Sequence, residues 1–211
     1  AMVLVVACVV AHLAPAADDG WVQLFNGKDT SGWTDGGKPW LVEDGVLTWQ
    51  KGCGYIWTEK SYGDFVLDLE VKVSKGCNSG IFIRSNPRNA VQGGIEIQVL
   101  DSHGKPKLGK HDFGAVYDAL APSANPVKPA GEWNRVTITC NDNKIQVVVN
   151  GQQIIDMDLD QWTEGNKNPD GSKNKFRKPL KDFARQGHIG FQDHGKAVWF
   201  RNVRLKELDR K

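Results

Sequence analysis

The sequence lacks an excess of charge of either sign, because 27 lysine and arginine residues stand against 25 aspartate and glutamate residues. A balanced chain offers no general electrostatic argument for a nucleic-acid partner. It also lacks long segments with the 3.6-residue apolar period of amphipathic helices, and no internal repeat is visible. These absences argue against a mainly helical fold and against binding to nucleic acid.

The cysteines lack the spacing of a zinc site, since no Cys-x-x-Cys pair and no paired His–Cys spacing occurs. Cys53 and Cys77 each follow a Lys-Gly pair just before an expected strand. We therefore predict a Cys53–Cys77 disulfide, which an exported protein would retain. Cys140 falls at an inward position of a strand and is expected to be a buried thiol.

No apolar run is long enough to cross a bilayer. The longest, from Met2 to Leu13, is followed by Ala-Pro-Ala-Ala at residues 14–17. Residues 1–17 are therefore interpreted as a signal peptide, and the chain is expected to be exported to the periplasm or the cell exterior. The usual basic residues before the run are missing, and two alternatives remain: a buried strand, or a lipoprotein signal ending at Cys8.

Short strand patterns separated by turn signals fill the rest of the chain, which is rich in glycine. The clearest runs from Phe65 to Val73, where apolar and polar residues alternate as in a strand with one buried face. Other strands are expected at residues 21–25, 40–42, 46–50, 55–58, 80–84, 94–100, 114–117, 135–141, 145–149, 152–156, 187–192 and 197–205. With no crossover helix, this pattern predicts one all-β domain, residues 18–211, of two packed antiparallel sheets.

Polar residues on one face of three strands identify a candidate site. In the segment 94–100, β-branched residues alternate with Glu96 and Gln98, so these two side chains should lie outward. The same reasoning applies to the segments 78–84 and 187–194. If the three strands are neighbours, one outer face collects Arg84, Glu96, Gln98, Gln192 and His194. These groups can bind a hydroxylated ring and move a proton.

Aromatic residues and glycines border this cluster. Tyr55 and Trp57 share a strand face and are expected to stack against a sugar. Gly80 and Gly190 remove side chains from the same face, which should leave room for a ligand. The other tryptophans considered are expected in the core: Trp21, Trp40, Trp133 and Trp199.

Three further features leave alternatives open. His111 and Asp112 could bind a divalent metal ion with a partner from elsewhere, although two adjacent residues are a weak signal. Asp101 has the opposite parity to Glu96, so a conventional two-carboxylate glycosidase needs a bulge or strand end to pair them. Residues 166–181 carry six lysines and arginines and form either a solvated loop or a cover over an acidic or polyhydroxyl ligand.

Nine short motifs between Gly20 and Leu208 resemble those of the 3-keto-disaccharide hydrolase family, which has the concanavalin A-like lectin/glucanase fold. They are Trp21–Lys28, Tyr62–Phe65, Asn78–Arg84, Glu96–Asp101, Gly114–Tyr117, Gly131–Asn134, Val149–Gly151, Gly187–Gly195 and Phe200–Val203. The resemblance implies a jelly-roll sandwich with a carbohydrate site on its concave face. It also implies an enzyme whose substrates are glycosides oxidised at C3.

A 3-keto group acidifies the sugar C2–H, so a base could drive β-elimination of the C1 leaving group before water adds back. Our hypothesis assigns His194 or Glu96 as base, Arg84 as oxyanion stabiliser, and Tyr117 or His111 as acid. The residues expected to bind the small-molecule carbohydrate are Tyr55, Trp57, Gln98, Asp101 and Gln192. The alternatives are a non-catalytic carbohydrate-binding module, a two-carboxylate glycosidase and a structural interaction domain.

Overall fold

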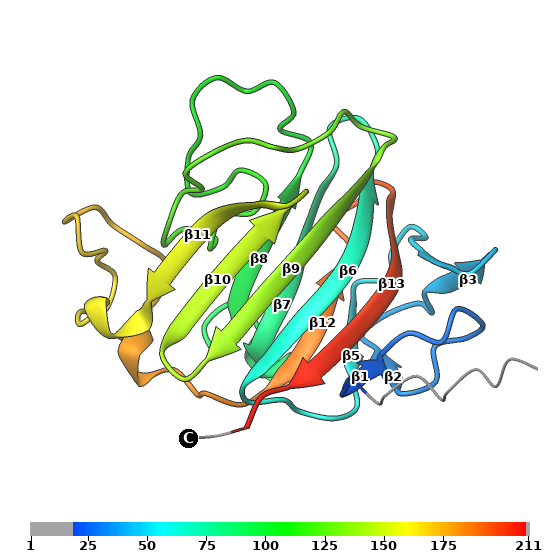
Figure 1. Ribbon diagram of the computed structural model, residues 1–211, viewed down its shortest axis with the longest axis horizontal. Coiled ribbons are helices and arrows are strands. Elements are labelled where there is room, and N and C mark those ends of the chain that lie inside the picture. The colour runs from blue at the N-terminus through cyan, green and yellow to red at the C-terminus, as the bar shows by residue number, and fades with distance from the viewer. Residues whose placement is uncertain (1–18, 210–211) are drawn as a thin grey trace, which may run out of the picture.

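Two antiparallel β-sheets pack face to face in the computed structural model, which describes residues 19–209 (Figure 1). The eight-stranded sheet has the order β11-β10-β9-β6-β13-β4-β3, with β1 paired to β13, and the five-stranded sheet has the order β2-β5-β12-β7-β8. The predicted all-β sandwich is therefore confirmed. The interpretations of residues 1–17 and of Cys8 lie outside the described residues.

The strands closely follow the predicted ranges. The eight-stranded sheet contains β1 (Trp21–Gln23), β3 (Leu41–Glu43), β4 (Val46–Thr48), β6 (Phe65–Val73), β9 (Trp133–Asn141), β10 (Lys144–Val149), β11 (Gln152–Asp158) and β13 (Val198–Glu207). The five-stranded sheet contains β2 (Trp33–Asp35), β5 (Tyr55–Thr58), β7 (Asn78–Ser85), β8 (Ile95–Leu100) and β12 (His188–Gln192). Short 3-10 turns occur at η1 (Pro87–Asn89), η2 (Leu159–Gln161) and η3 (Leu180–Asp182).

The core lies between the sheets. Alternation along β6 buries Phe65, Leu67 and Leu69 against the inward side chains of the other sheet. Phe191 of β12 stacks on Phe200 of β13, with ring centroids 4.0 Å apart and an interplanar angle of 8°. Each such fully buried side chain contributes about 1.5–3 kcal/mol relative to an exposed one, so this stack helps to hold the two sheets together.

Two segments depart from the predicted elements. Strand β2 was not predicted, because Trp33 is its one apolar residue and a single apolar residue shows no period of two. Conversely, residues 114–117 form only isolated bridges, from Val116 to Ile97 and to Leu120, rather than a strand. This segment nevertheless lies alongside β8, where Gln98 N donates to Ala115 O and Tyr117 N donates to Glu96 O.

All three cysteines in the described residues are free, so the predicted Cys53–Cys77 disulfide is wrong. Both thiols are buried, and burial raises the pKa of each to about 11. Equivalent Lys-Gly-Cys turns at two strand ends do not by themselves bring two sulfur atoms to bonding distance. Cys140 is a buried thiol as predicted, and burial raises its pKa to about 12.

The tryptophans divide between the core and one outer face. Trp40 is buried in the core as predicted. Trp21, Trp133 and Trp199 instead lie half-buried on the outer face of the eight-stranded sheet, which corrects their predicted placement. Cations cover them there: the Lys72 ammonium is 4.6 Å from the Trp199 ring centroid, and the Arg201 guanidinium carbon is 4.1 Å from that of Trp133.

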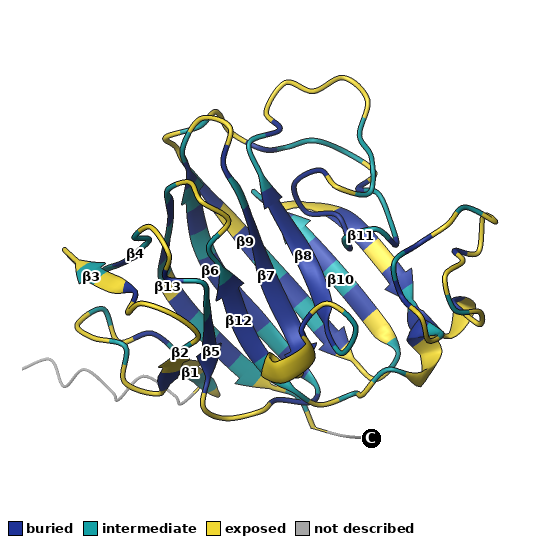
Figure 2. Ribbon diagram, turned by 180° about the vertical axis from the view of Figure 1, so that it is seen from behind, coloured by how far each residue is buried: buried dark blue, intermediate teal, exposed yellow. Residues whose placement is uncertain are grey.

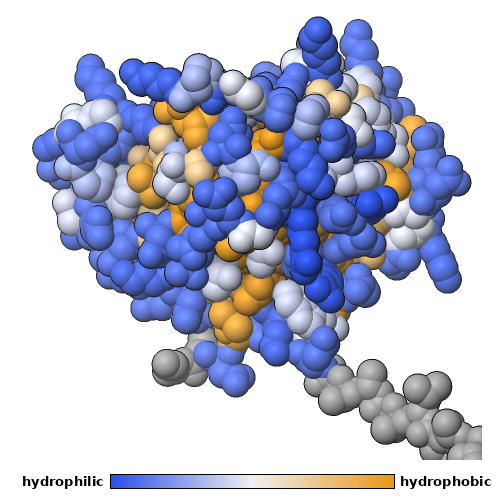
Figure 3. All heavy atoms as spheres, turned by 45° about the horizontal axis from the view of Figure 1, so that its top comes forward, coloured by the Kyte–Doolittle hydropathy of each residue, from blue (hydrophilic) through white to orange (hydrophobic). Residues whose placement is uncertain are grey.

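The exterior is mainly polar. Figure 3 shows hydrophilic residues over most of one face, with hydrophobic residues visible between them. The exposed large hydrophobic side chains of the described residues are Val22, Leu41 and Val91, which come from separate segments. Among residues 19–209, no helix has the length and apolar character needed to cross a membrane.

Candidate functional site

The predicted cluster lies on the outer side of the five-stranded sheet except for Arg84, and its member His194 lies beside that sheet on the loop after β12. We call this surface the five-strand face and define it by Tyr55, Trp57, Phe82, Glu96, Gln98 and Gln192. Strand pairing sets Glu96 opposite Phe82, and Gly190 opposite both Phe82 and Trp57. A second row pairs Gln98 with Gly80 and Gln192 with Tyr55. The register therefore brings residues from four strands together, as the strand-neighbour argument requires.

Loops cover this face. Strands β7 and β8 are buried along almost their whole length (Figure 2), although only their inner side packs on the other sheet. Strand β6, in contrast, alternates between buried and partly exposed residues over much of its length. The outward side chains of β7 and β8 are thus shielded from water, which strengthens any electrostatic interaction among them.

The two glycines on this face make room for protein side chains. A Cβ at Gly80 would lie 2.5 Å from Oε1 of Glu96, and one at Gly190 would overlap the Trp57 indole ring. Gly80 thus lets the Glu96 carboxylate lie over β7, and Gly190 lets the Trp57 ring lie over β12. The predicted space for a ligand is therefore occupied by these two side chains.

Glu96 is the buried carboxylate of the site, with 7% of the residue exposed. Its Oε2 lies 3.4 Å from Nζ of Lys175, at the long end of hydrogen-bond distance. Burial raises the pKa of Glu96, while the charges of Lys175, His194 and His111 oppose that rise. A buried carboxyl group whose pKa is raised in this way is a candidate for proton transfer.

Lys175 joins Glu96 to the loop that follows β8. Its Nζ lies 4.2 Å from the ring centroid of Tyr117, whose pKa is raised by burial and by the charges of Glu96 and Asp118. The Tyr117 hydroxyl, whose ordinary pKa is already 10.0, carries a proton at neutral pH. The His111 ring lies 4.5 Å from the Tyr117 ring, and its Nε2 is 3.1 Å from Oδ1 of Asp118.

Sequence reasoning missed Lys175 as an individual residue. It belongs to the basic segment 166–181, and nothing in the sequence distinguishes it from the other five lysines and arginines there. Its contact with Glu96, which is distant in sequence, supports the interpretation of this segment as a cover over the site. His194 is exposed on the loop after β12, close enough for its charge to lower the pKa of Glu96.

Two amides on this face differ in their hydrogen bonding. Gln192 Nε2 donates to Oη of Tyr55 over 3.1 Å. Gln98 Nε2 donates to Oδ1 of Asn78 over 3.0 Å, but Gln98 Oε1 has no partner within the described residues although the residue is only 2% exposed. A buried acceptor without a donor costs about 1–3 kcal/mol. A hydroxyl group of a ligand would relieve that cost.

Aromatic rings form a platform beside these polar groups. Tyr55 and Trp57 stack with centroids 5.4 Å apart and an interplanar angle of 26°, and Phe82 meets both rings edge-on. These rings form a cluster separate from the main core. Tyr55 is the partly exposed member of the cluster, so its ring is accessible to a ligand.

Arg84 is the exception to the predicted cluster. Its backbone is left-handed, with φ of +48°, and the β7–β12 register shifts nearby, which ends the strand alternation. The guanidinium is fully buried and donates to Gly63 O (2.8 Å), Asp142 O (2.6 Å) and Asp64 Oδ1 (2.7 Å). Arg84 therefore ties the ends of the two sheets together, and its predicted position on the site face is wrong.

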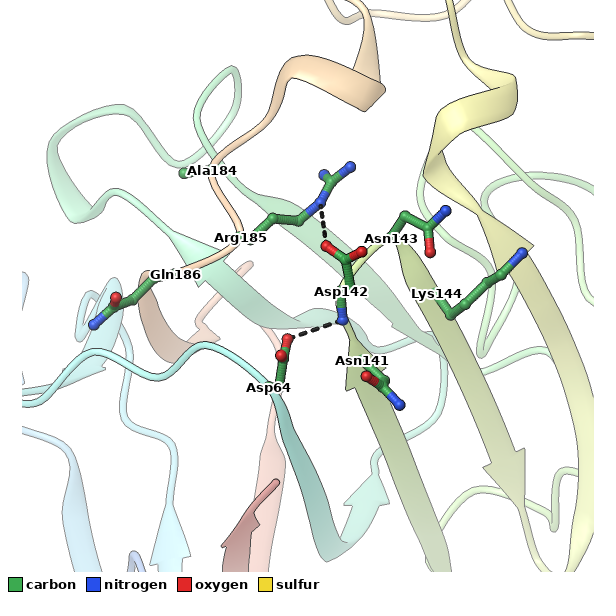
Figure 4. A pocket seen from close by; sticks show the side chains of 8 residues that line it. All are labelled: Asp64, Asn141, Asp142, Asn143, Lys144, Ala184, Arg185 and Gln186. Atoms are coloured by element: carbon green, nitrogen blue, oxygen red, sulfur yellow. Dashed lines mark hydrogen bonds and ion pairs between the residues drawn. The ribbon is translucent and has the colours of Figure 1, made fainter. Parts of the chain in front are cut away.

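A hollow of about 760 Å³ lies at this end of the sandwich (Figure 4). It is lined by Asp64, Asn141, Asp142, Asn143, Lys144, Ala184, Arg185 and Gln186. Asp64 accepts from the buried Arg84 and from Asp142 N, and Arg185 lies 3.9 Å from Asp142. These pairings are structural contacts between loops. We therefore place the candidate site on the five-strand face and not in this hollow, although the hollow has the stated volume.

Asp101 does not pair with Glu96. Its Oδ2 accepts from Gly76 N over 2.7 Å and so closes the turn before β7. The Glu96–Asp101 pair of a two-carboxylate glycosidase is therefore not formed, and the predicted contact of Asp101 with substrate has no support in its position. Asp193 accepts from Gly52 N and Gly195 N and so holds the loop after β12.

The predicted metal pair is not brought together with a third ligand. Both oxygens of Asp112 bind Nζ of Lys105, at 2.7 and 2.9 Å, and Oδ2 also accepts from Gly109 N. His111 turns instead to Asp118. Within residues 19–209, no group of three or more His, Cys, Asp or Glu side chains is arranged to hold a metal ion. These residues do not fit the predicted divalent metal site.

The chain is similar to known proteins over most of its length. Residues 20–206 match the family model described as a 3-keto-alpha-glucoside-1,2-lyase-like domain. The chain is 32% identical over 234 aligned residues to the 3-keto-disaccharide hydrolase of Bacteroides thetaiotaomicron, covering 92% of this chain and 81% of that protein.

Solved structures agree with the fold. A Parabacteroides distasonis protein named as a glycosyl hydrolase is similar at 35% identity with a TM-score of 0.81, covering 89% of this chain and 99% of that one. A carbohydrate-binding module from Bacillus subtilis is similar at 16% identity with a TM-score of 0.55, covering 83% and 96%. The latter likeness concerns the fold alone.

Proposed function

The chain belongs to the 3-keto-α-glucoside-1,2-lyase-like family, and on this premise we propose that it cleaves the glycosidic bond of 3-keto-disaccharides at the five-strand face. The observation that carries the proposal is Glu96, a buried carboxyl group whose pKa burial raises. It faces the Lys175 ammonium and lies close to the Tyr117 phenol, beside an aromatic platform. This arrangement provides a base, a positive charge and a proton donor within one water-shielded region.

Elimination followed by hydration accounts for all atoms. Glu96 takes the proton from C2, and the C–H electron pair forms the enolate of the C3 ketone. The enolate then collapses to restore the ketone, a C1–C2 double bond forms, and the C1–O bond breaks. The leaving oxygen receives a proton. Water then adds across the double bond, with hydroxyl at C1 and hydrogen at C2, so the net reaction is hydrolysis.

The residues divide these tasks by charge and burial. Glu96 serves as base because its raised pKa makes the carboxylate a stronger proton acceptor. Lys175 takes the oxyanion-stabilising role first assigned to Arg84, since it is the cation nearest to Glu96. Tyr117 serves as acid because its hydroxyl, with an ordinary pKa of 10.0, carries a proton at neutral pH. His111 and His194 add positive charge at the edge of the site.

Binding follows from the remaining groups of the five-strand face. Tyr55 stacks on the apolar side of a sugar ring, with Trp57 supporting it from the next position of the face. Gln98 Oε1 accepts a hydrogen bond from a sugar hydroxyl, and its Nε2 keeps the amide oriented through Asn78. Gln192 holds the Tyr55 hydroxyl in place.

The test is product release from a chromogenic 3-keto-glucoside and from the same glucoside without the keto group, in deuterated water. We expect cleavage of the keto sugar alone, with solvent deuterium incorporated at C2. Glu96→Gln should lower kcat about 10²–10⁴-fold. The matched control is Glu70→Gln, on the opposite sheet and paired with Arg201, which should leave kcat unchanged.

Other outcomes contradict the proposal in different ways. Binding of the keto sugar without cleavage would indicate a carbohydrate-binding module. Cleavage without deuterium at C2 would refute the elimination route, and equal kcat losses in the two variants would refute the role of Glu96.

A further inference from the structure

The segment that delivers Lys175 is held in shape by its own contacts. Asn168, which is buried, donates through Nδ2 to Ser172 Oγ (3.1 Å) and to Lys173 O (3.3 Å). Its Oδ1 accepts from Trp162 Nε1 over 2.8 Å. The buried Phe176 ring packs edge-on against Phe183 with centroids 5.4 Å apart. Asn168 Nδ2 also lies 3.3 Å from Asp118 O, and Phe176 belongs to the main core. These contacts fold the segment 166–181 and attach it to the body of the protein, but none of them joins it by a hydrogen bond to the hairpin that carries Glu96.

Gln92 makes the hydrogen bonds that join this segment to the hairpin of Glu96. It lies between η1 and β8, on the same hairpin as Glu96. Its Nε2 donates to Lys175 O over 2.8 Å, and its Oε1 accepts from Arg177 N over 3.0 Å. One carboxamide thus satisfies a carbonyl and an N–H two residues apart on another segment, which defines both the position and the direction of that segment.

Few other hydrogen bonds join residues 78–100 to residues 166–181. Apart from the Lys175–Glu96 ion pair, the bonds of Gln92 are the hydrogen bonds between residues 78–100 and residues 166–181 in the described chain. The ion pair is long, and a lysine side chain has four carbons with free rotation. Small movements of the Lys175 backbone would therefore take the ammonium away from the carboxylate.

We propose that Gln92 is a positioning residue, whose carboxamide holds the Lys175 backbone so that the ammonium lies between the Glu96 carboxylate and the Tyr117 ring. Gln92 acts through Lys175 and does not itself contact the reacting sugar. The catalytic consequence rests on the proposed function, whereas the effect of Gln92 on the Glu96 carboxyl group does not.

Several charged groups face Glu96 and must be considered together. Lys175 comes from the segment 166–181, His194 from the loop after β12, and His111 and Tyr117 from the loop after β8. Among them, Lys175 makes the largest opposing contribution to the raised pKa of Glu96. Since the ammonium favours the ionised carboxylate, moving it away raises the pKa of Glu96 further.

Three variants separate positioning from general structure. Gln92→Met keeps the length of the side chain and removes both hydrogen bonds to the segment. Lys175→Met removes the charge itself. Ser172→Ala is the matched control, because it removes bonds from Asn168 and Lys110 and so loosens the same segment while leaving Gln92 intact.

The readouts are the pKa of Glu96, from carbon-13 NMR of carboxyl-labelled full-length protein, and the acid limb of kcat/KM against pH. We expect Lys175→Met to raise the pKa by about one unit and Gln92→Met to raise it by roughly half as much. The acid limb should move to higher pH by the same amounts. Ser172→Ala should move neither, and the double variant Gln92→Met/Lys175→Met should match Lys175→Met alone.

The inference is overturned if Gln92→Met leaves the pKa of Glu96 unchanged or if Ser172→Ala shifts that pKa equally. It is also overturned if the pKa shifts of Gln92→Met and Lys175→Met add in the double variant. The NMR titration needs no turnover. A protein that shows the expected pKa shifts but cleaves no 3-keto-glycoside therefore refutes the proposed function and supports the positioning role. If the wild-type protein cleaves the 3-keto-glycoside but Gln92→Met leaves the pKa of Glu96 unchanged, the positioning role is refuted and the proposed function is supported.

Discussion

The outer faces of the two sheets both carry shielded carboxyl groups, but the pKa values of these groups are shifted in opposite directions. On the eight-stranded sheet, Asp68 accepts from Arg135, Thr137 and Arg204. Burial alone would raise the pKa of Asp68, but these hydrogen bonds outweigh it and the net pKa is lowered. Glu70 is held similarly by Arg201 and Asn202.

The five-strand face has the same kinds of side chain but fewer partners. Glu96 has one cation at 3.4 Å, and burial raises its pKa. Gln98 Oε1 has no partner among the described residues. A fully paired charge network stabilises a fold, whereas a buried carboxyl group with few partners retains the capacity to exchange a proton. This difference distinguishes a structural face from a chemical one better than residue composition does.

Loss of the carboxylate charge should have opposite effects on stability on the two faces. Asp68→Asn should lower the free energy of unfolding by about 1.5–3 kcal/mol, because it removes charge-assisted hydrogen bonds to a buried carboxylate. Glu96→Gln should leave that free energy unchanged or higher at pH 7, since it removes a carboxylate whose ionisation burial disfavours. Urea unfolding measures both, and a similar loss in the two variants would contradict the comparison.

The pH dependence of stability should also differ between Glu96 and Asp68, with a smaller effect than the substitutions at pH 7. The folded pKa of Glu96 is above its usual 4.5, so wild-type stability is lost as the pH rises through the folded pKa. The gain from Glu96→Gln should therefore be present at pH 8 and vanish below pH 4.5. For Asp68 the folded pKa is below 3.8, so its contribution is present above 3.8 and lost as the pH falls through the folded pKa. Melting temperatures measured across this pH range test both predicted directions. A gain in melting temperature for Glu96→Gln that does not change with pH would contradict the prediction for Glu96.

The aromatic residues should show the smallest effect. Tyr55→Ala should raise KM for the 3-keto-glucoside by about 2–10-fold, in line with aromatic stacking energies. Trp133→Ala, its counterpart on the eight-stranded sheet, should leave KM unchanged because cations already cover that ring. Steady-state kinetics of the two variants make the test. An equal rise in KM would mean that the two faces do not differ in binding.

Period-two alternation predicted much of the site. It placed Glu96, Gln98 and Gln192 on one face, since regular strands oblige alternate side chains to point the same way. It failed for Arg84, where a left-handed residue and a register shift end the alternation. For Trp133 and Trp199 the size of the side chain suggested the core, but both share the outward parity of Arg135 and Arg201 and lie outward, as alternation requires.

The sequence by itself determined the all-β class, most strand ranges and the outward direction of the residues on regular strands, because these depend on neighbours within a few positions. The tertiary structure alone decided that Lys175 meets Glu96, that Arg84 ties the sheet ends, and that Cys53 and Cys77 stay apart. Those outcomes depend on how loops distant in sequence pack together. No local period carries that information, since loop conformation is set by the contacts that the folded sheets provide.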